Sequence, residues 1–128
     1  MPVAFVYGTL TEPDRVADLL ESFVFVGPAV LSGLHAVDGD YPTLAPGGSV
    51  AGRLLRTQEL DRLDEYERVA DGLYTRVTVP GDDDLGEVAV YVGDPDRLGA
   101  DADWPGEGDF RRRVRSYLCD HPVRVCRQ

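Results

Sequence analysis

Short β-branched and aromatic runs, broken by glycine and proline, most constrain the fold of this chain. The first run spans Val3 to Tyr7, stops at Gly8 and precedes a helix predicted over residues 13–21. Further strands are predicted over residues 23–26, 29–37, 50–56, 74–79 and 87–92. Because helices do not alternate regularly with these strands, the pattern favours a mixed α+β fold over a doubly wound parallel sheet.

Two more helices are predicted further along the chain. Residues 58–67 contain no glycine, proline or β-branched residue, which favours a helix. Near the C-terminus, Phe110, Val114 and Leu118 recur at helical spacing, so the arginine cluster of residues 111–115 is expected on the polar side of a third helix.

The connections between these elements are rich in turn-forming residues. An acidic loop over residues 81–86 is predicted to join the last two strands into a hairpin. Residues 41–48 are predicted as a turn-rich connection, and residues 93–108, which carry Trp104, as a long surface loop.

Length and hydropathy indicate one soluble unit. At 128 residues the chain has the size of one typical domain, so we expect a single domain over residues 1–128. No apolar run reaches the roughly 20 residues that span a bilayer, and the N-terminus has no basic flank or cleavage site. We therefore expect a cytoplasmic protein without a membrane partner.

The charge of the chain is strongly acidic. Its formal net charge is -10, and all 13 basic residues are arginine. This composition resembles that of proteins from organisms that keep molar salt in the cytoplasm, with an ordinary acidic protein as the alternative. It argues against a nucleic-acid partner, since phosphate binding needs a basic surface.

Cys119 and Cys126, with His121 between them, do not predict a metal site. Two thiols and one imidazole fall short of four zinc ligands, and the spacing is not Cys-x-x-Cys. In a reducing cytoplasm both are expected as free thiols, although the spacing is also compatible with a disulfide.

Glu67 is the main candidate for chemistry. On a helical wheel Glu67 falls with Leu60 and Leu63, on the apolar side. Burial and the helix C-terminus both raise the pKa of a carboxyl group toward the range of a general acid/base. Two alternatives stay open: Glu67 forms a structural ion pair with an arginine such as Arg76, or Asp64, near the same sector, is the functional carboxylate.

The turn after the first strand is a candidate anion cradle. Gly8 lets backbone N–H groups converge on a ligand between a strand and a helix. An ordinary strand-to-helix connection would have the same sequence.

Five short motifs occur in order within residues 3–92: Val6-Tyr7-Gly8-Thr9-Leu10, Tyr41-Pro42, Val50-Ala51-Gly52, Leu63-Asp64-Glu65-Tyr66-Glu67 and Tyr74-Thr75-Arg76. Their order resembles that of the γ-glutamylcyclotransferase-like superfamily, which includes γ-glutamylamine cyclotransferases and avirulence-induced-gene-like proteins. The resemblance implies a compact, partly closed mixed β-barrel with flanking helices and a pocket at its mouth.

The resemblance also implies an activity and a site. In the family a γ-glutamyl α-amine attacks its own γ-amide carbonyl and releases 5-oxoproline and an amine, without metal or cofactor. Glu67 matches the catalytic carboxylate, Tyr7-Gly8-Thr9-Leu10 match the substrate-binding loop, and Tyr74 matches a substrate-binding tyrosine. Arg68 departs from the pattern, since a glycine commonly follows the catalytic glutamate.

Two functions outside catalysis remain as alternatives. The first is a small-molecule binding module that keeps the pocket and uses Glu67 only to hold an amine. The second is an interaction domain that works through the acidic surface.

We predict that the thermal stability of the protein rises with salt into the molar range. Self-repulsion at a net charge of -10 is relieved by screening. Melting curves in low and molar KCl measure this, and a melting temperature that stays flat or falls would exclude the high-salt interpretation.

Overall fold

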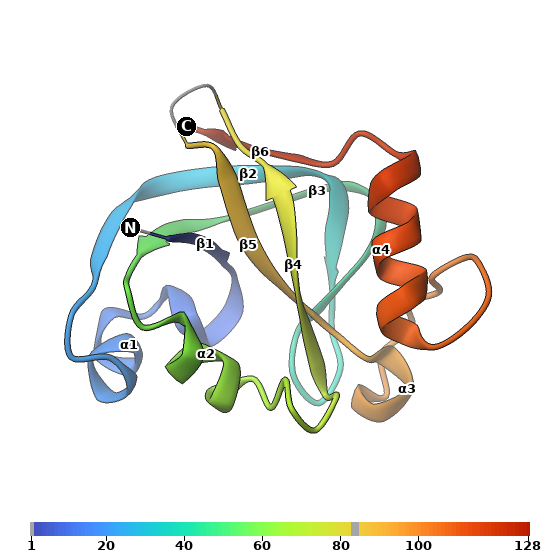
Figure 1. Cartoon of the computed structure of the whole chain (residues 1–128), viewed down its shortest axis with the longest axis horizontal. Helices are drawn as coiled ribbons and strands as arrows, with labels where there is room; N and C mark the ends of the chain where they lie inside the picture. Colours follow the sequence, from blue (N-terminus) through green and yellow to red (C-terminus); the bar gives the residue numbers. More distant parts are fainter. Residues whose placement is uncertain (1, 83–84) are drawn as a thin grey trace.

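A strongly curled six-stranded sheet forms the centre of the protein (Figure 1). The computed structural model describes residues 2–82 and 85–128, apart from the side chain of Thr9. The strands are β1 (Val3–Val6), β2 (Val24–Val37), β3 (Thr43–Arg56), β4 (Tyr74–Pro80), β5 (Glu87–Gly93) and β6 (Arg124–Arg127). Their order in the sheet is β4-β5-β1-β3-β2-β6. β1 and β5 are parallel, and the other neighbouring pairs are antiparallel.

Helices flank this sheet on two sides. They are the 3₁₀ helix η1 (Gly8–Thr11) and the α-helices α1 (Pro13–Leu19), α2 (Leu60–Tyr66), α3 (Pro95–Leu98) and α4 (Phe110–Asp120). Figure 1 shows α1 and α2 together below the sheet and α4 upright beside it. The mixed α+β class predicted from the sequence is confirmed.

The sheet curls because its two longest strands bend. β2 and β3 pair over 14 residues each, and β-bulges lie between Phe25 and Gly27 and between Ser32 and Leu34. At the opposite edges, a parallel bridge joins Gly81, just after β4, to Val125 in β6. The curled sheet is therefore a half-barrel, in agreement with the partly closed barrel that the family resemblance implied.

The pleat of β1 separates two apolar clusters. Val3 and Phe5 point into the cluster inside the curled sheet, whereas Ala4 and Val6 join the cluster beneath α1 and α2. This second cluster includes Val16 of α1 and Leu63 of α2, both fully buried. Burial of Leu63 therefore fixes which side of α2 faces the sheet.

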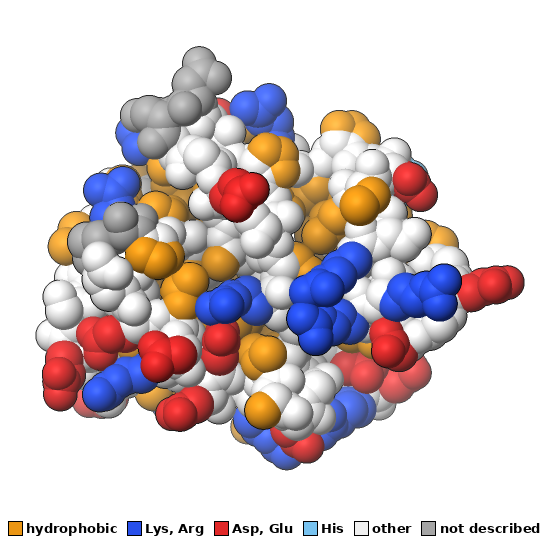
Figure 2. Space-filling view, in the orientation of Figure 1, with side chains coloured by type: hydrophobic (Ala, Val, Ile, Leu, Met, Phe, Trp, Pro, Cys, Tyr) orange, Lys and Arg blue, Asp and Glu red, His pale blue; other side chains and the backbone are white. Residues whose placement is uncertain are grey.

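The charged groups are distributed unevenly over the surface. Figure 2 shows acidic side chains gathered over α1 and α2, and basic side chains beside α4. In α4, Phe110 and Val114 are buried while Arg111, Arg112 and Arg115 are exposed. This confirms that the arginine cluster coats a helix. None of the described helices is long and apolar enough to cross a membrane.

Two predicted connections were wrong. Residues 41–48 were expected as turns, but β3 begins at Thr43 and runs through them, because the residues on both sides of Gly47 and Gly48 pair with β2. The two glycines have positive φ and lie at the irregularity opposite Gly33. Residues 93–108 were expected at the surface, yet they include α3, and Trp104 is only 2% exposed.

Trp104 is buried because α4 folds over it. Its ring packs edge-on against Phe110 at 6.3 Å and Tyr117 at 5.4 Å between centroids. Its indole N–H donates to the carbonyl of Leu44 at 3.2 Å. This contact ties α4 to β3.

The predictions of a hairpin and of free thiols in the C-terminal half of the chain agree with the structure. β4 and β5 form the expected hairpin, although Asp83 and Asp84 of its acidic loop lie outside the described residues. Cys119 and Cys126 are both free thiols. Strand β6, which carries Cys126, was not predicted.

We predict that Gly52→Ala lowers the free energy of unfolding by roughly 2–4 kcal/mol, the cost of forcing an extra group into a packed interior. A Cβ at Gly52 would collide with the carbonyl oxygen of Val6 and lie 2.7 Å from Cζ of Phe5. Urea denaturation measures the change. Ala51→Ser at the exposed neighbouring position should change it by less than about 0.5 kcal/mol, and similar values for both variants would contradict the close approach of β1 and β3.

Candidate active site

A cavity of about 160 Å³ lies where β1, α2 and β4 meet. Tyr7 follows β1, Glu67 ends α2, and Tyr74 begins β4, so three segments distant in sequence supply its wall. The lining consists of Phe5, Val6, Tyr7, Leu10, Tyr41, Pro42, Tyr66, Glu67, Arg68, Leu73, Tyr74 and Tyr91. Among these described lining residues, one is acidic and one is basic, and the rest are apolar or tyrosine. Such a site suits a small ligand with few, well-placed charges.

Glu67 lies in this cavity as the C-terminal cap of α2. The predicted helix over residues 58–67 is shorter in the structure, and the Glu67 backbone N–H donates to the Leu63 carbonyl at 2.9 Å. Burial raises the pKa of Glu67 from 4.5 to about 7. The carboxyl group therefore titrates near neutral pH, in the range of a general acid/base.

The ion pair expected as an alternative for Glu67 belongs to Asp64 instead. Nη1 of Arg76 lies 3.2 Å from Oδ2 of Asp64, and the Tyr91 hydroxyl donates to Oδ1 of Asp64 at 2.6 Å. None of the ion pairs found over residues 2–82 and 85–128 includes Glu67. Asp64 is thus held in a polar network, whereas Glu67 faces an aromatic cavity without a counter-ion in the described chain.

Two tyrosines flank the Glu67 carboxyl group. Burial, followed by the neighbouring Tyr74 and the charge of Glu67, raises the pKa of Tyr7. Burial, followed by the charge of Glu67, raises the pKa of Tyr74. The Tyr7 hydroxyl donates to the Tyr91 carbonyl at 2.5 Å, and the Tyr74 hydroxyl donates to the Pro42 carbonyl at 2.5 Å. Both phenols stay protonated at neutral pH, and their bonds to backbone carbonyls fix the orientation of their rings.

The candidate cradle is only partly in contact with the cavity. Tyr7 and Leu10 line it, whereas Gly8 lies at the start of η1 with a φ of 76° and packs near Pro42, itself a lining residue. Thr9 lies inside η1, and its side chain is outside the described part of the chain. The positive φ explains why glycine occupies position 8.

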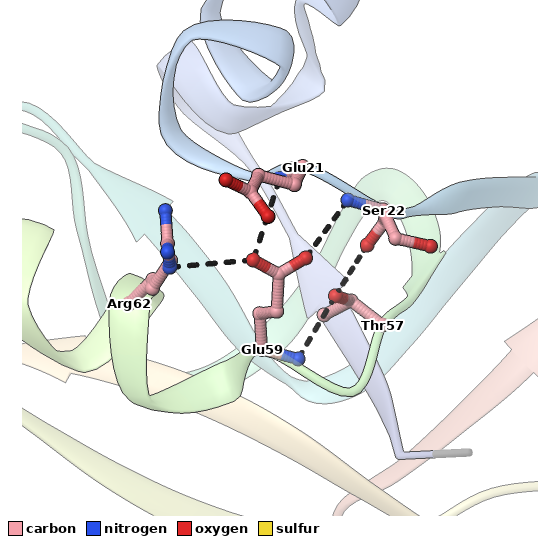
Figure 3. Close-up of polar contacts among 5 residues, drawn as sticks. All are labelled: Glu21, Ser22, Thr57, Glu59 and Arg62. Atoms are coloured by element: carbon pink, nitrogen blue, oxygen red, sulfur yellow. Dashed lines mark hydrogen bonds and ion pairs between the residues drawn. The ribbon is translucent and has the colours of Figure 1, made fainter.

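The start of α2 is anchored by a network of hydrogen bonds and one ion pair around Glu59 (Figure 3). The Glu59 carboxylate accepts the backbone N–H of Ser22 at 2.8 Å and of Glu21 at 3.3 Å, and Nε of Arg62 lies 3.3 Å from it. Thr57 completes the network, since its hydroxyl donates to the Ser22 carbonyl at 2.8 Å and accepts the Glu59 N–H at 3.0 Å. This network fixes α2 against the segment after α1, and thereby fixes the helix that ends at Glu67.

Several lining residues were not singled out from the sequence as site residues. Tyr91 could have been found, because strand alternation places it on the same face as Ala89, in the cluster beneath α1 and α2. Tyr41 lies in the connection between β2 and β3, and its only signal in the sequence is the Tyr41-Pro42 motif of the family resemblance. Within the described residues, no cluster of three His, Cys, Asp or Glu side chains could hold a metal ion.

We predict that Glu67→Gln changes the pH dependence of stability. Between about pH 4.5 and pH 7 the folded protein keeps a proton on Glu67 that the unfolded chain has lost, so stability decreases as pH rises through this window. Glutamine removes that loss. From about pH 5 to about pH 8 the variant should therefore gain on the order of 2 kcal/mol relative to the wild type.

Urea denaturation of both proteins at the two pH values measures this difference. Glu65→Gln, at an exposed position on the same helix, serves as the control and should show no such gain. An equal pH dependence for Glu67→Gln and the wild type would contradict a raised pKa at Glu67.

The chain is similar in sequence and in fold to known proteins. The chain is 38% identical to AIG2-like protein C of Arabidopsis thaliana over 115 residues, which cover 83% of this chain and 65% of that relative. The chain thus spans slightly less than two thirds of the relative that it matches. A solution structure of another Arabidopsis thaliana protein shares 28% identity and superposes with a TM-score of 0.55, covering 93% of this chain and 84% of the other.

A solved structure described as a gamma-glutamyl cyclotransferase has the same fold. It superposes with a TM-score of 0.57 at 15% identity, over 94% of this chain and 99% of the other, a level of identity that speaks for the fold alone. The sequence profile described as "Gamma-glutamyl cyclotransferase, AIG2-like" matches residues 4–112. Since this match covers most of the chain, from the second residue of β1 through β5, the chain belongs to the AIG2-like gamma-glutamyl cyclotransferase family.

Proposed function

We propose that this protein cyclises a small γ-glutamyl compound to 5-oxoproline and releases the amine. The observation that carries the proposal is Glu67, a carboxyl group in an aromatic cavity with a pKa raised by burial to about 7. Family membership supports the substrate class, since the matched profile is named for this reaction.

In the proposed reaction Glu67 carries protons from the attacking nitrogen to the leaving nitrogen. Its carboxylate takes a proton from the substrate α-ammonium, and the freed amine attacks the γ-amide carbonyl carbon to form the C–N bond of the five-membered ring. The protonated Glu67 then donates that proton to the leaving nitrogen as the original amide bond breaks. The ring nitrogen loses a second proton to the Glu67 carboxylate, which passes it to the released amine, so that the amine departs as an ammonium ion. Atoms balance without water, metal or cofactor, and much of the rate comes from positioning because the attack is intramolecular.

The other predicted site residues take positioning roles in this proposal. Tyr7 and Tyr74 form rigid walls beside Glu67, and their aromatic faces favour the cationic form of the arriving substrate. Gly8, Thr9 and Leu10 provide the turn whose main-chain donors would meet the α-carboxylate of the substrate.

We expect Glu67→Gln to lower turnover by roughly 10²- to 10⁴-fold, the usual contribution of a positioned proton-transfer group. Glutamine keeps the size of the side chain, so substrate binding should stay close to that of the wild type. Release of 5-oxoproline from a panel of γ-glutamyl compounds, followed by mass spectrometry, measures the rate.

Asp64→Asn is the comparison variant, because Asp64 lies one helical turn earlier and is already engaged by Arg76 and Tyr91. Its loss of turnover should stay below about 10-fold, since it loses only one partly exposed ion pair. If Asp64→Asn is the inactive variant and Glu67→Gln is active, the acid/base is assigned to the wrong carboxylate.

The alternative function is a binding module that retains the pocket without catalysis. It differs from the enzyme in one measurable respect: γ-glutamyl compounds would bind in the cavity and be recovered intact. Calorimetric binding without any 5-oxoproline, in wild-type protein, would favour this alternative.

A further inference from the structure

Arg68 gives the mouth of the cavity a positive charge. It directly follows Glu67 and lines the same cavity, and its side chain is 59% exposed. Its φ of 56° makes it the one non-glycine residue with positive φ among those that the structure describes. An L-residue pays a conformational cost for this backbone geometry, which a glycine would not pay.

The arginine belongs to a cluster that carries an excess of positive charge. Nη2 of Arg68 contacts Oδ2 of Asp71, and Nη2 of Arg97 lies 3.0 Å from the same oxygen. Arg97 also donates from Nη1 to the Asp71 carbonyl at 2.7 Å. Two guanidinium groups thus share one carboxylate, so the three side chains sum to one positive charge, on a protein whose net charge is -10.

The contact with Asp71 leaves Arg68 able to bind a further anion. A guanidinium group has five N–H donors in a planar fork, and the ion pair uses Nη2. Asp71, which does not line the cavity, holds one end of this fork in place through Nη2, while Arg97 pairs with the same carboxylate. This arrangement orients Arg68 without cancelling its charge.

The orientation of the bound substrate decides which of its carboxylate groups contacts Arg68. The reacting carbonyl must approach Glu67, which lies deeper than its exposed neighbour Arg68. The turn of residues 7–10, which follows β1 and contributes Tyr7 and Leu10 to the lining, is the proposed partner of the glutamyl α-carboxylate. With the α-carboxylate held by that turn and the carbonyl at Glu67, the leaving group is the remaining part of the substrate that can contact the exposed Arg68 side chain.

We propose that Arg68 binds a carboxylate on the leaving amine, which makes γ-glutamyl amino acids and peptides the preferred substrates over γ-glutamyl alkylamines. This inference rests on the proposed cyclotransferase function. It assigns Arg68 a role in specificity, separate from the proton transfer of Glu67.

The test uses two substrates that differ by one carboxylate. γ-Glutamylalanine and γ-glutamylethylamine release alanine and ethylamine, which share the same two-carbon amine skeleton. Because their amide reactivities differ, the informative quantity is the ratio of the two kcat/KM values, compared between wild type and Arg68→Gln. Losing a charge-assisted contact at a partly exposed site should lower this ratio about 10-fold, mainly through KM for γ-glutamylalanine.

Arg68→Lys and Arg97→Gln are the matched controls. Lysine keeps the charge but loses the fork, so it should restore part of the ratio. Arg97 pairs with the same aspartate but does not line the cavity, and its replacement should change the ratio by less than about 2-fold. Thermal melts confirm that each variant is folded.

The outcomes separate this inference from the proposed function. An equal fall of kcat/KM for both substrates in Arg68→Gln would mean that Arg68 holds the glutamyl part and would overturn the inference, as would an unchanged ratio. An equal change of the ratio in Arg97→Gln would also overturn the inference, because the preference would then come from the positive charge of the cluster and not from a contact with Arg68. If wild-type protein makes no 5-oxoproline, the proposed function fails, and calorimetric binding of the same two compounds to wild type and Arg68→Gln still decides the role of Arg68.

Discussion

The pairing of β1 on both of its edges is the constraint on which the rest of the structure depends. This strand has four residues, and all four are buried. It pairs with β3 on one edge and β5 on the other, while its alternating side chains enter two different apolar clusters. Both edges and both faces of β1 are therefore in contact with other elements. A register shift of one residue would move each side chain into the wrong apolar cluster, so the register of β1 is fixed.

The position of the cavity follows from this fixed strand. Tyr7 comes directly after β1, so its ring is placed by the strand, and its hydroxyl bonds to the backbone of β5 through Tyr91. α2 packs on the other side of the same strand through Leu63, and the network around Glu59, the N-cap residue of α2, fixes the start of the helix. A carboxyl group held this firmly in apolar surroundings costs folding free energy, a trade that is typical of functional sites.

The sequence predicted the parts of the fold that depend on local pattern. The strand before Gly8, the helix ending near Glu67 and the hairpin of β4 and β5 were visible because residue spacing and turn residues agree there. The course of β3 past Gly47 and Gly48 was not visible, because the strand continues there only through the pairing of the flanking residues with β2, while the two glycines themselves have positive φ. Likewise, the partner of Asp64 is Arg76, twelve positions away on another element, and a helical wheel gives no information on such a contact. The wheel did place Glu67 on the apolar side of α2, while the roles of the site residues remain predictions.

The burial of Trp104 has a consequence for spectroscopy. It is the single tryptophan of the chain, and it sits between α4 and β3 with its N–H bonded to Leu44. Trp104 is not among the residues that line the cavity. Intrinsic fluorescence of this protein therefore comes from one environment, the seam between α4 and the sheet. A red shift of its emission reports separation of α4 from the sheet, and the tyrosine-lined cavity contributes no second indole signal to confuse it.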